Sequence, residues 1–452
     1  MAVALLLGGQ ANGNAGREMV IQLAALFVAY QAYASSTAGR ISDEKVVRWA
    51  GWVLAATIGL VLLHLVPLPY NLWAILSPVD TAKQVLEQLG LANGWRPFAL
   101  DPAETFDNLL LLLPPIAMFY AVLRLSERGR TRLALVALGL AIVGAALGLL
   151  QYGSGTQSLD FYEATHIGFG SGYFANRNHQ ADFAIIGWLL AAGLIASPWV
   201  PTARFGAAGQ AGILLLMSAL FILAILATGS RGGFLLAGFA ALAILIIRFA
   251  GNAGKLFGAL IGAGALGAAI LAIAASSGSA LLGRTLERFG NEDEVRLIIW
   301  PRVLEIVQDT MPLGAGIGSF VEYYRFTEPL HMVGRKFVNS AHNEFLEIAF
   351  DAGIPGLLLL FAGIFVIGWA AWKALRGGLG DAGDYRRLQA VAGVAVIVLI
   401  AHSSFDYPLR TTGLAVTFAA LCGLLMPRPS DSTIVTSETD RTTVDSSARN
   451  TT

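Results

Sequence analysis

Long apolar runs, interrupted by shorter polar segments, recur along almost the whole chain. A helix needs about 20 apolar residues to cross the hydrocarbon core of a bilayer, and its backbone polar groups must be satisfied within the segment. About eleven runs approach this length, centred on residues 19–34, 49–66, 108–125, 133–152, 181–197, 211–227, 233–247, 256–275, 353–372, 388–402 and 413–426. The start MAVALLLGGQ predicts either a stub or a shortened twelfth span. The pattern predicts an all-α polytopic membrane protein with about 11–12 transmembrane helices.

Lysine and arginine concentrate in alternate loops, which predicts the orientation of the spans. Cytoplasmic loops of membrane proteins carry an excess of these residues. The loops with this excess hold Arg40, Lys45 and Arg48, then Arg124, Arg128, Arg130 and Arg132, then Arg204, then Arg248 and Lys255, then Lys373, Arg376, Arg386 and Arg387. We expect these loops on the cytoplasmic side and the loops between them on the opposite, outer side.

Two outer segments are too long to be simple turns. Residues 67–107 contain SPVDTAKQVLEQLGL, whose spacing predicts a helix on the outer membrane surface. Residues 276–343 predict two or three short helices separated by PLGAGIGS. We therefore divide the chain into an N-terminal transmembrane bundle with short outer loops (1–275), one large outer helical loop (276–343), C-terminal transmembrane helices (344–426) and a disordered cytoplasmic tail (427–452).

Composition narrows the function classes. The chain of 452 residues is 56% hydrophobic and 13% charged, which is typical of a membrane protein and not of a soluble domain. Thirty basic and thirty acidic residues cancel, so no overall field indicates a nucleic-acid partner. A single cysteine, Cys422, excludes a disulfide framework and a thiolate metal site. The sequence has no GxxxxGK or HExxH motif, which argues against an ATP-driven pump and a zinc site, and we expect no metal and no cofactor.

Arginines in the outer loops run against the cytoplasmic bias. They occur in GYFANRNHQAD (Arg177, beside Asn176 and His179), in TGSRGG (Arg231), in HSSFDYPLR (Arg410, after His402 and Asp406), and in the large loop as Arg284, Arg288, Arg296 and Arg302. The guanidinium fork matches phosphate oxygens and keeps its charge at any working pH. Several arginines near one bilayer surface therefore indicate a diphosphate site. The alternative is that each one anchors its loop to lipid headgroups or to a carboxylate.

A histidine lies where the large outer loop meets the next span. In NSAHNEFLEIAFDAGIPG the polar start predicts a helix cap, the apolar residues follow a helical face, and AGIPG predicts a break in the helix. His342 is then expected in the first turn, where the helix dipole favours a neutral imidazole that can accept a proton. The alternative is a capping or interfacial histidine that is hydrogen-bonded to Glu344 or to a carbonyl.

Taken together and in order, these motifs resemble the O-antigen ligase and polymerase superfamily of bacterial inner membranes. The resemblance covers residues 176–410 and includes FANRNHQA, TGSRGG, RLIIWPRVLEIVQDTMPLGAGIGSF, SAHNEFLEIAFDAGIPG and HSSFDYPLR. It implies transfer of a glycan from an undecaprenyl diphosphate carrier to an acceptor hydroxyl on the periplasmic face. It implies His342 as the base that activates the acceptor, and Arg177, Arg231 and Arg296 as ligands of the diphosphate. Arg288 and Arg410 match more loosely, and Asn176, His179, Glu344 and Asp406 are candidate supporting residues.

Several functions stay open at this level. The acceptor is the lipid A core in a ligase, the growing glycan in a polymerase, or a protein side chain in an oligosaccharyltransferase. Direct displacement would invert the anomeric centre, and the sequence offers no strong Asp or Glu nucleophile for a covalent intermediate. A transporter or flippase of anionic lipid-linked sugars would also need arginines, but such sites usually lie near the bilayer midplane. A non-enzymatic scaffold gives these arginines no role.

Overall fold

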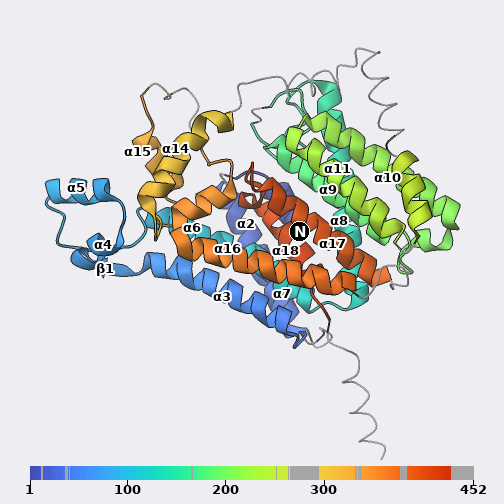
Figure 1. Ribbon diagram of the computed structural model, residues 1–452, viewed down its shortest axis with the longest axis horizontal. Helices are drawn as coiled ribbons and strands as arrows, with labels where there is room; N and C mark the ends of the chain where they lie inside the picture. Colours follow the sequence, from blue (N-terminus) through green and yellow to red (C-terminus); the bar gives the residue numbers. More distant parts are fainter. Residues whose placement is uncertain are drawn as a thin grey trace, which may run out of the picture.

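The computed structural model describes an almost entirely helical chain (Figure 1). It describes residues 1–11, 14–35, 41–163, 166–250, 252–262, 295–330, 338–376 and 384–428, and the single residues 39, 264 and 333. The helices are α1 (Ala2–Leu7), α2 (Ala15–Ala34), α3 (Lys45–Leu65), α4 (Tyr70–Leu76), α5 (Asp80–Gln88), α6 (Pro102–Leu111), α7 (Leu113–Leu123), α8 (Glu127–Ser154), α9 (Arg177–Leu194), α10 (Ala207–Thr228), α11 (Arg231–Arg248), α14 (Val295–Thr310), α15 (Phe320–Thr327), α16 (Glu344–Arg376), α17 (Asp384–His402) and α18 (Thr412–Leu425). Two short 3-10 helices, η1 (Pro201–Arg204) and η2 (Pro408–Arg410), complete the helical elements.

The prediction of an all-α membrane protein is confirmed. Seven helices of the described residues are long and apolar enough to cross a bilayer: Lys45–Leu65, Pro102–Leu123, Glu127–Ser154, Ala207–Thr228, Arg231–Arg248, Glu344–Arg376 and Tyr385–His402. The predicted runs at 19–34, 181–197 and 413–426 are helical as α2, α9 and α18. The run at 256–275 is described only in part, as the short apolar helix Ala253–Gly262. Helix α1 has six residues and is too short to be a span.

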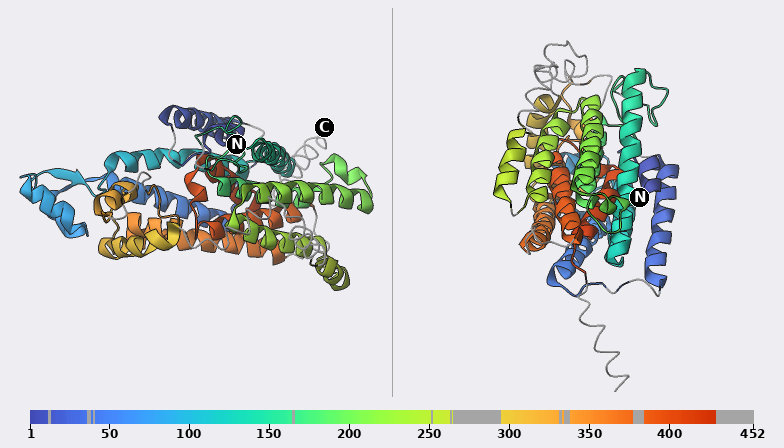
Figure 2. Two further views of the ribbon diagram at one scale, coloured as in Figure 1. Left: turned by 90° about the horizontal axis from the view of Figure 1, so that it is seen from above. Right: turned by 90° about the vertical axis from the view of Figure 1, so that its right-hand side faces the viewer.

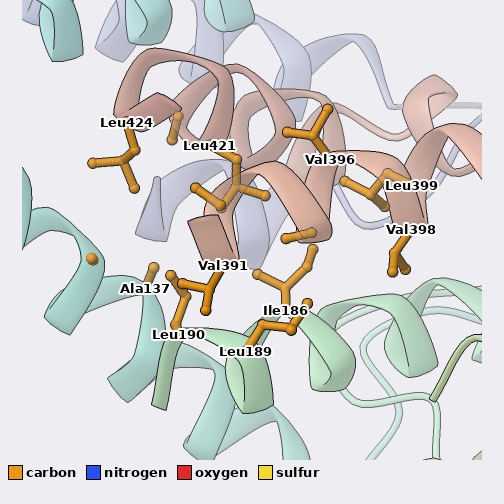
Figure 3. Packing of buried hydrophobic residues seen from close by; sticks show 14 of the residues in the cluster. Ala137, Ile186, Leu189, Leu190, Val391, Val396, Val398, Leu399, Leu421 and Leu424 are labelled. Carbon is orange, nitrogen blue, oxygen red and sulfur yellow. The ribbon is translucent and has the colours of Figure 1, made fainter. Parts of the chain in front are cut away.

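The long helices lie side by side in one bundle, and α9 is enclosed in the part shown on the right of Figure 1 (Figures 1 and 2). Helix α9 packs against α8, α10, α11 and α17, and nearly all of its side chains are buried. Figure 3 shows Ile186, Leu189 and Leu190 of α9 facing Val391 of α17, next to Leu421 of α18. Small residues let the helices approach closely, because a side-chain carbon added at Gly187 would lie 2.5 Å from Cβ of Ala141. The bundle core thus fixes the position of α9 from all sides.

The two long segments that the sequence predicts as outer loops lie, where described, at one end of the bundle, which we call the α14–α15 end (left in Figure 1). The predicted helix in 67–107 is found as α5, but the segment also contains a two-stranded antiparallel ribbon, β1 (Pro67–Pro69) with β2 (Trp95–Pro97). The predicted helices of the large loop are found as α14 and α15, separated by residues 311–319. A second apolar cluster, formed by Val303, Ile306, Phe320, Tyr324 and Phe350, ties these helices to the start of α16.

Helix α16 is interrupted at Gly353, where the helical backbone conformation breaks. The backbone of Gly353 has φ 54° and ψ −145°, and the helix resumes behind it as far as Arg376. A side-chain carbon at Gly353 would lie 2.2 Å from the carbonyl oxygen of Pro312, in the loop after α14. Only glycine fits such a conformation and such an approach. The prediction that AGIPG breaks the helix is therefore confirmed, and the kink lets the loop after α14 pack against α16.

At the opposite end of the bundle, Arg130 donates a hydrogen bond to the backbone at the end of α18. The last carbonyl groups of a helix have no partner within it, and three side chains supply partners for those of α18. Tyr385 Oη donates to Leu424 O at 2.9 Å, Gln389 Nε2 to Leu425 O at 3.1 Å, and Arg130 Nη1 to Met426 O at 2.7 Å. Arg130 is fully buried, and its cation also complements the negative end of the helix dipole.

We expect Arg130→Met to destabilise the protein by about 1–3 kcal/mol, because it leaves a buried carbonyl without a donor. The loss is measured as a lower midpoint of thermal unfolding in detergent. Arg132→Met, an exposed arginine on the same helix, is the matched control and should leave the midpoint unchanged. Equal midpoints for the two variants would contradict the role of Arg130.

Candidate functional site

Basic side chains stand at or beside the starts of four helices at the α14–α15 end. Arg177 is the first residue of α9 and Arg231 the first of α11. Arg296 is the second residue of α14, and His342 precedes α16 by two residues. A helix start presents free backbone N–H groups and the positive end of the dipole. The starts of α9, α11 and α16 therefore add three positive helix ends to the charges of the arginines.

The sequence motifs around the first two arginines work as helix caps. Asn176 Oδ1 accepts a hydrogen bond from the backbone N–H of Asn178 at 2.9 Å. Ser230 Oγ accepts one from the N–H of Gly233 at 3.0 Å. Such caps fix where a helix begins. The NRN and SRGG patterns therefore set each arginine at the first helical position.

His342 has an unusual backbone conformation directly before α16. Its φ is +50°, a left-handed value that few residues other than glycine adopt. Asn343 caps α16, because its Oδ1 accepts from the N–H groups of Phe345 at 3.0 Å and Leu346 at 3.1 Å. The prediction that His342 lies in the first turn is therefore wrong. Strained backbone of this kind is concentrated at functional sites.

The ring of His342 lies against a buried carboxylate. His342 Nδ1 is 3.5 Å from Asp406 Oδ1, and the ring centroid is 4.9 Å from that of Tyr407. The Asp406 side chain is fully buried, whereas 26% of the His342 side chain is exposed. The distance is long for a hydrogen bond, as is common at catalytic sites without substrate. Asp406 faces Nδ1, so Nε2 is the ring atom available to accept a proton.

Three further groups hold Asp406 in place. Its Oδ2 accepts from Asn178 Nδ2 at 2.6 Å and from Asn176 Nδ2 at 3.4 Å, and its Oδ1 accepts from the N–H of Tyr407 at 3.0 Å. Burial disfavours the charged carboxylate, but the contact with His342 and the nearby rings of His179 and His402 hold the pKa of Asp406 well below its usual range. Asp406 is therefore a buried anion that can orient and charge-balance a histidine. Burial raises the pKa of the neighbouring Tyr407 to about 12, so its hydroxyl stays protonated.

A second buried histidine–aspartate pair lies next to this one. His402 Nδ1 is 2.5 Å from Asp182 Oδ1, and both residues have no exposed surface. A side-chain carbon added at Gly232, in the first turn of α11, would lie 3.2 Å from His402 Nε2. The pair therefore joins α9 and α17 directly beside Arg231.

Arg177 is a buried cation with unsatisfied donors. It is 4% exposed, and its Nε and Nη1 atoms have no hydrogen-bond acceptor among the described residues. The guanidinium carbon lies 4.2 Å from the centroid of the Phe169 ring. A side-chain carbon at Gly229 would lie 3.4 Å from Arg177 Nη1, so Arg177 borders the turn that leads to Arg231. Buried charges are normally paired, and this geometry suits an anionic ligand.

Other predicted site residues have protein partners. Arg410 Nη2 lies 3.0 Å from Glu347 Oε1 and 3.4 Å from Asp351 Oδ2. Burial alone would lower the pKa of Arg410, but these carboxylates raise it above its ordinary value. Arg410 is therefore already neutralised and is a poor candidate for a diphosphate. Its partner Glu347 also accepts from Ser340 Oγ at 2.7 Å, which supports the turn of His342.

Glu344 does not bond His342, as one alternative required. Its Oε2 accepts from Ser403 Oγ at 2.6 Å and its Oε1 from the N–H of Leu409 at 2.8 Å. Glu344 therefore fastens the loop that carries Asp406. Arg284 and Arg288 lie outside the described residues.

The structure brings His342, Asp406, Asn176 and His179 into one cluster, with Arg177 on the same helix start. Arg296 lies close enough to act electrostatically on His402. Sequence reasoning missed Asn178 and Asp182. Both lie in the polar first turns of α9, and a carboxylate inside an apolar run such as that of Asp182 is a general signal of function.

Comparison with known proteins agrees with this geometry over part of the chain. No curated protein matches the chain. A family model described as O-antigen ligase (Wzy_C) matches residues 216–361, which include Arg231, Arg296 and His342 and leave out Arg177, Asp406 and Arg410. This multi-pass membrane protein therefore carries a domain of the O-antigen ligase (Wzy_C) family.

Proposed function

We propose that the protein is a glycan transferase of the bacterial inner membrane, with its site on the periplasmic face. It moves a glycan from an undecaprenyl diphosphate carrier to an acceptor hydroxyl. The observation that carries the proposal is the contact of His342, in its left-handed backbone conformation, with the buried Asp406. At the same end of the bundle, Nε and Nη1 of Arg177 have no acceptor among the described residues. The matched family includes ligases and polymerases that act on such carriers.

His342 is the general base in this proposal. Its Nε2 takes the proton of the acceptor hydroxyl while the oxygen attacks the anomeric carbon of the donor sugar. Asp406 orients the ring and stabilises the imidazolium that forms, which is the role of the carboxylate in other histidine–aspartate pairs. The bond from the anomeric carbon to the diphosphate breaks in the same step. The products are the extended acceptor and undecaprenyl diphosphate.

Arginines stabilise the leaving group. Negative charge grows on the diphosphate as the bond breaks, and fixed positive groups at that position lower the barrier. Arg177, Arg231 and Arg296 fit this role through their places at the helix starts, and Arg410 does not, because Glu347 and Asp351 already neutralise it. A single displacement inverts the configuration at the anomeric carbon.

Ligase and polymerase activity use the same chemistry and differ in the acceptor. We favour a ligase and keep a polymerase as the alternative, because the site residues do not separate them. A transporter is less consistent with the site, since Arg177, Arg231 and His342 stand at helix ends and not at the middle of the spans.

The test is reconstitution of the purified protein with synthetic undecaprenyl diphosphate glycan and candidate acceptors, in the presence of EDTA. We expect transfer, with inversion of the anomeric centre read by NMR. A polymerase lengthens the lipid-linked glycan without another acceptor, whereas a ligase needs one. Movement of substrate across a vesicle with no glycosidic product would overturn the proposal in favour of a transporter.

A further inference from the structure

A cavity of about 710 Å³ opens beside the His342 turn, and Arg177 does not line it. It lies between α6, α16, α17, α18 and η2, and Asn339, Ser340 and Tyr407 form part of its wall. The ring of Tyr407 is also in contact with that of His342. The volume is that of a site for a small molecule or for part of a larger one. Tyr407 therefore lies between this cavity and His342, the proposed base.

The polar end of the cavity is acidic. Five carboxyl side chains line it, against two guanidinium groups, from Asp101, Glu104, Glu322, Glu344 and Glu347 and from Arg325 and Arg410. Both arginines already face carboxylates, since Arg325 Nη1 lies 3.1 Å from Glu322 Oε1 and Arg410 Nη2 lies 3.0 Å from Glu347 Oε1. Asp101 and Glu104 form no ion pair with any other residue that the structure describes. The excess of carboxylates gives this end a negative electrostatic potential, which disfavours binding of a phosphate. Its carboxylates and amides can form hydrogen bonds with the hydroxyl groups of a sugar.

The other end of the cavity is apolar. The residues of α16 that line it run from Leu359 to Ile367, which is about 12 Å of helix at 1.5 Å per residue. Leu112, Ile400 and Phe418 also line this end. It therefore suits a hydrocarbon chain.

The two ends meet without a basic group that is free of a carboxylate. An amphiphile with a phosphate between its sugar and its chain would place that phosphate among Glu104, Glu344 and Glu347. A like charge in that position is costly. A sugar joined directly to an apolar chain meets only hydrogen-bonding groups and then apolar side chains.

We propose that this cavity binds the acceptor, and that the acceptor is a glycolipid whose uncharged sugar is joined to its apolar chain without an intervening phosphate. The inference rests on the proposed transfer reaction, because it assigns the acceptor of that reaction. In this inference the glycan donor binds near Arg177, the acceptor binds in the acidic cavity, and His342 acts between the two substrates. It also names Glu104 as a residue that selects against charged acceptors.

The first test compares two acceptors with the same neutral disaccharide and the same alkyl chain, one joined directly and one through a phosphate. The protein is held in nanodiscs free of glycoside detergent, with undecaprenyl diphosphate glycan as donor. We expect the direct glycoside to have a KM at least about tenfold lower, as expected for one added like charge. Glu104→Gln should reduce the ratio between the KM values of the two acceptors. Glu328→Gln is the control, because Glu328 is an acidic residue at the same end that does not line the cavity, and it should leave that ratio unchanged. A lower KM for the phosphate-linked acceptor would overturn the inference.

The second test fills the apolar end. Ile364→Trp should raise the KM for the acceptor and leave the KM for the donor unchanged. Leu358→Trp is the matched control on the same helix, because Leu358 is 65% exposed and does not line the cavity. A change in the donor KM alone for Ile364→Trp would assign the cavity to the donor and overturn the inference.

A binding measurement separates this inference from the proposed function. A direct alkyl glycoside with a photoreactive chain should label the α16 segment between Leu359 and Ile367, and Ile364→Trp should abolish the labelling. If the segment were labelled but no glycan were transferred, the proposed function would be overturned, and the conclusion that the cavity binds a glycolipid would stand. Transfer without labelling of this segment would sustain the function and overturn the acceptor site.

Discussion

His342→Asn should lower the rate of glycan transfer by about 10²- to 10⁴-fold, the usual contribution of a general base. Asparagine is the informative replacement because it tolerates the left-handed backbone that His342 adopts, at φ +50°. The loop that ends at Asn343 and the capped start of α16 should therefore keep their structure. The loss is measured as turnover of the reconstituted protein at saturating donor and acceptor.

Two further variants make this result specific. His166→Asn removes a histidine of another loop and should leave the rate unchanged. Asp406→Asn keeps the size of the side chain but removes the charge that faces His342 Nδ1, so it should also lower kcat strongly while leaving KM for the donor similar. If His342→Asn retained the rate of the unmodified protein and remained folded, the base would have to be another group.

Arg177→Met should lower transfer by about 10²- to 10³-fold, as expected for the loss of one fixed group that stabilises transition-state charge. The same variant should be as stable as the unmodified protein or more stable. Its guanidinium is buried, and its Nε and Nη1 have no acceptor in the described part of the chain. A buried charge without a partner opposes folding, and methionine can pack on the Phe169 ring instead.

Arg177→Met is thus expected to lower the transfer activity without lowering the stability, and this combination distinguishes a functional residue from a structural one. Activity and the midpoint of thermal unfolding are measured on the same preparation. Arg17→Met is the matched control, because Arg17 is exposed and also lies over an aromatic ring, with its guanidinium carbon 5.1 Å from the Tyr162 centroid. It should change neither quantity much. A parallel loss of activity and stability for Arg177→Met would mean that Arg177 is a structural residue.

Hydropathy predicted the fold well for a simple physical reason. A bilayer forces each span to be a helix with an apolar surface, so the runs around residues 49–66, 133–152 and 211–227 are visible without any tertiary information. The ribbon of Pro67–Pro69 with Trp95–Pro97 was missed, because prolines argue against strands except at edges. The break at Gly353 was visible in AGIPG, but that a second helical segment continues the same element as far as Arg376 was not.

The site was predictable only in part. Charges that interrupt apolar runs, such as Arg231, are visible in the sequence because they are costly near lipid. Pairings are not visible, since they join residues far apart in the chain. His342 and Asp406 come from different loops, and so do Asp182 and His402. The same limit explains Arg410, which sequence alone could not distinguish from an arginine free to bind a diphosphate, and which Glu347 and Asp351 neutralise in the structure.

The enclosed position of α9 has a consequence for how the protein is made. The first turns of α9 carry Arg177, His179 and Asp182, and these polar groups meet their neighbours only when α11 and α17 are in place. Because α9 is synthesised before α17, it enters the membrane before His402 is present. During this interval Asp182 lies next to lipid or the insertion machinery without its histidine partner. A nascent chain that stops before α17 should therefore be a preferred target of membrane quality control.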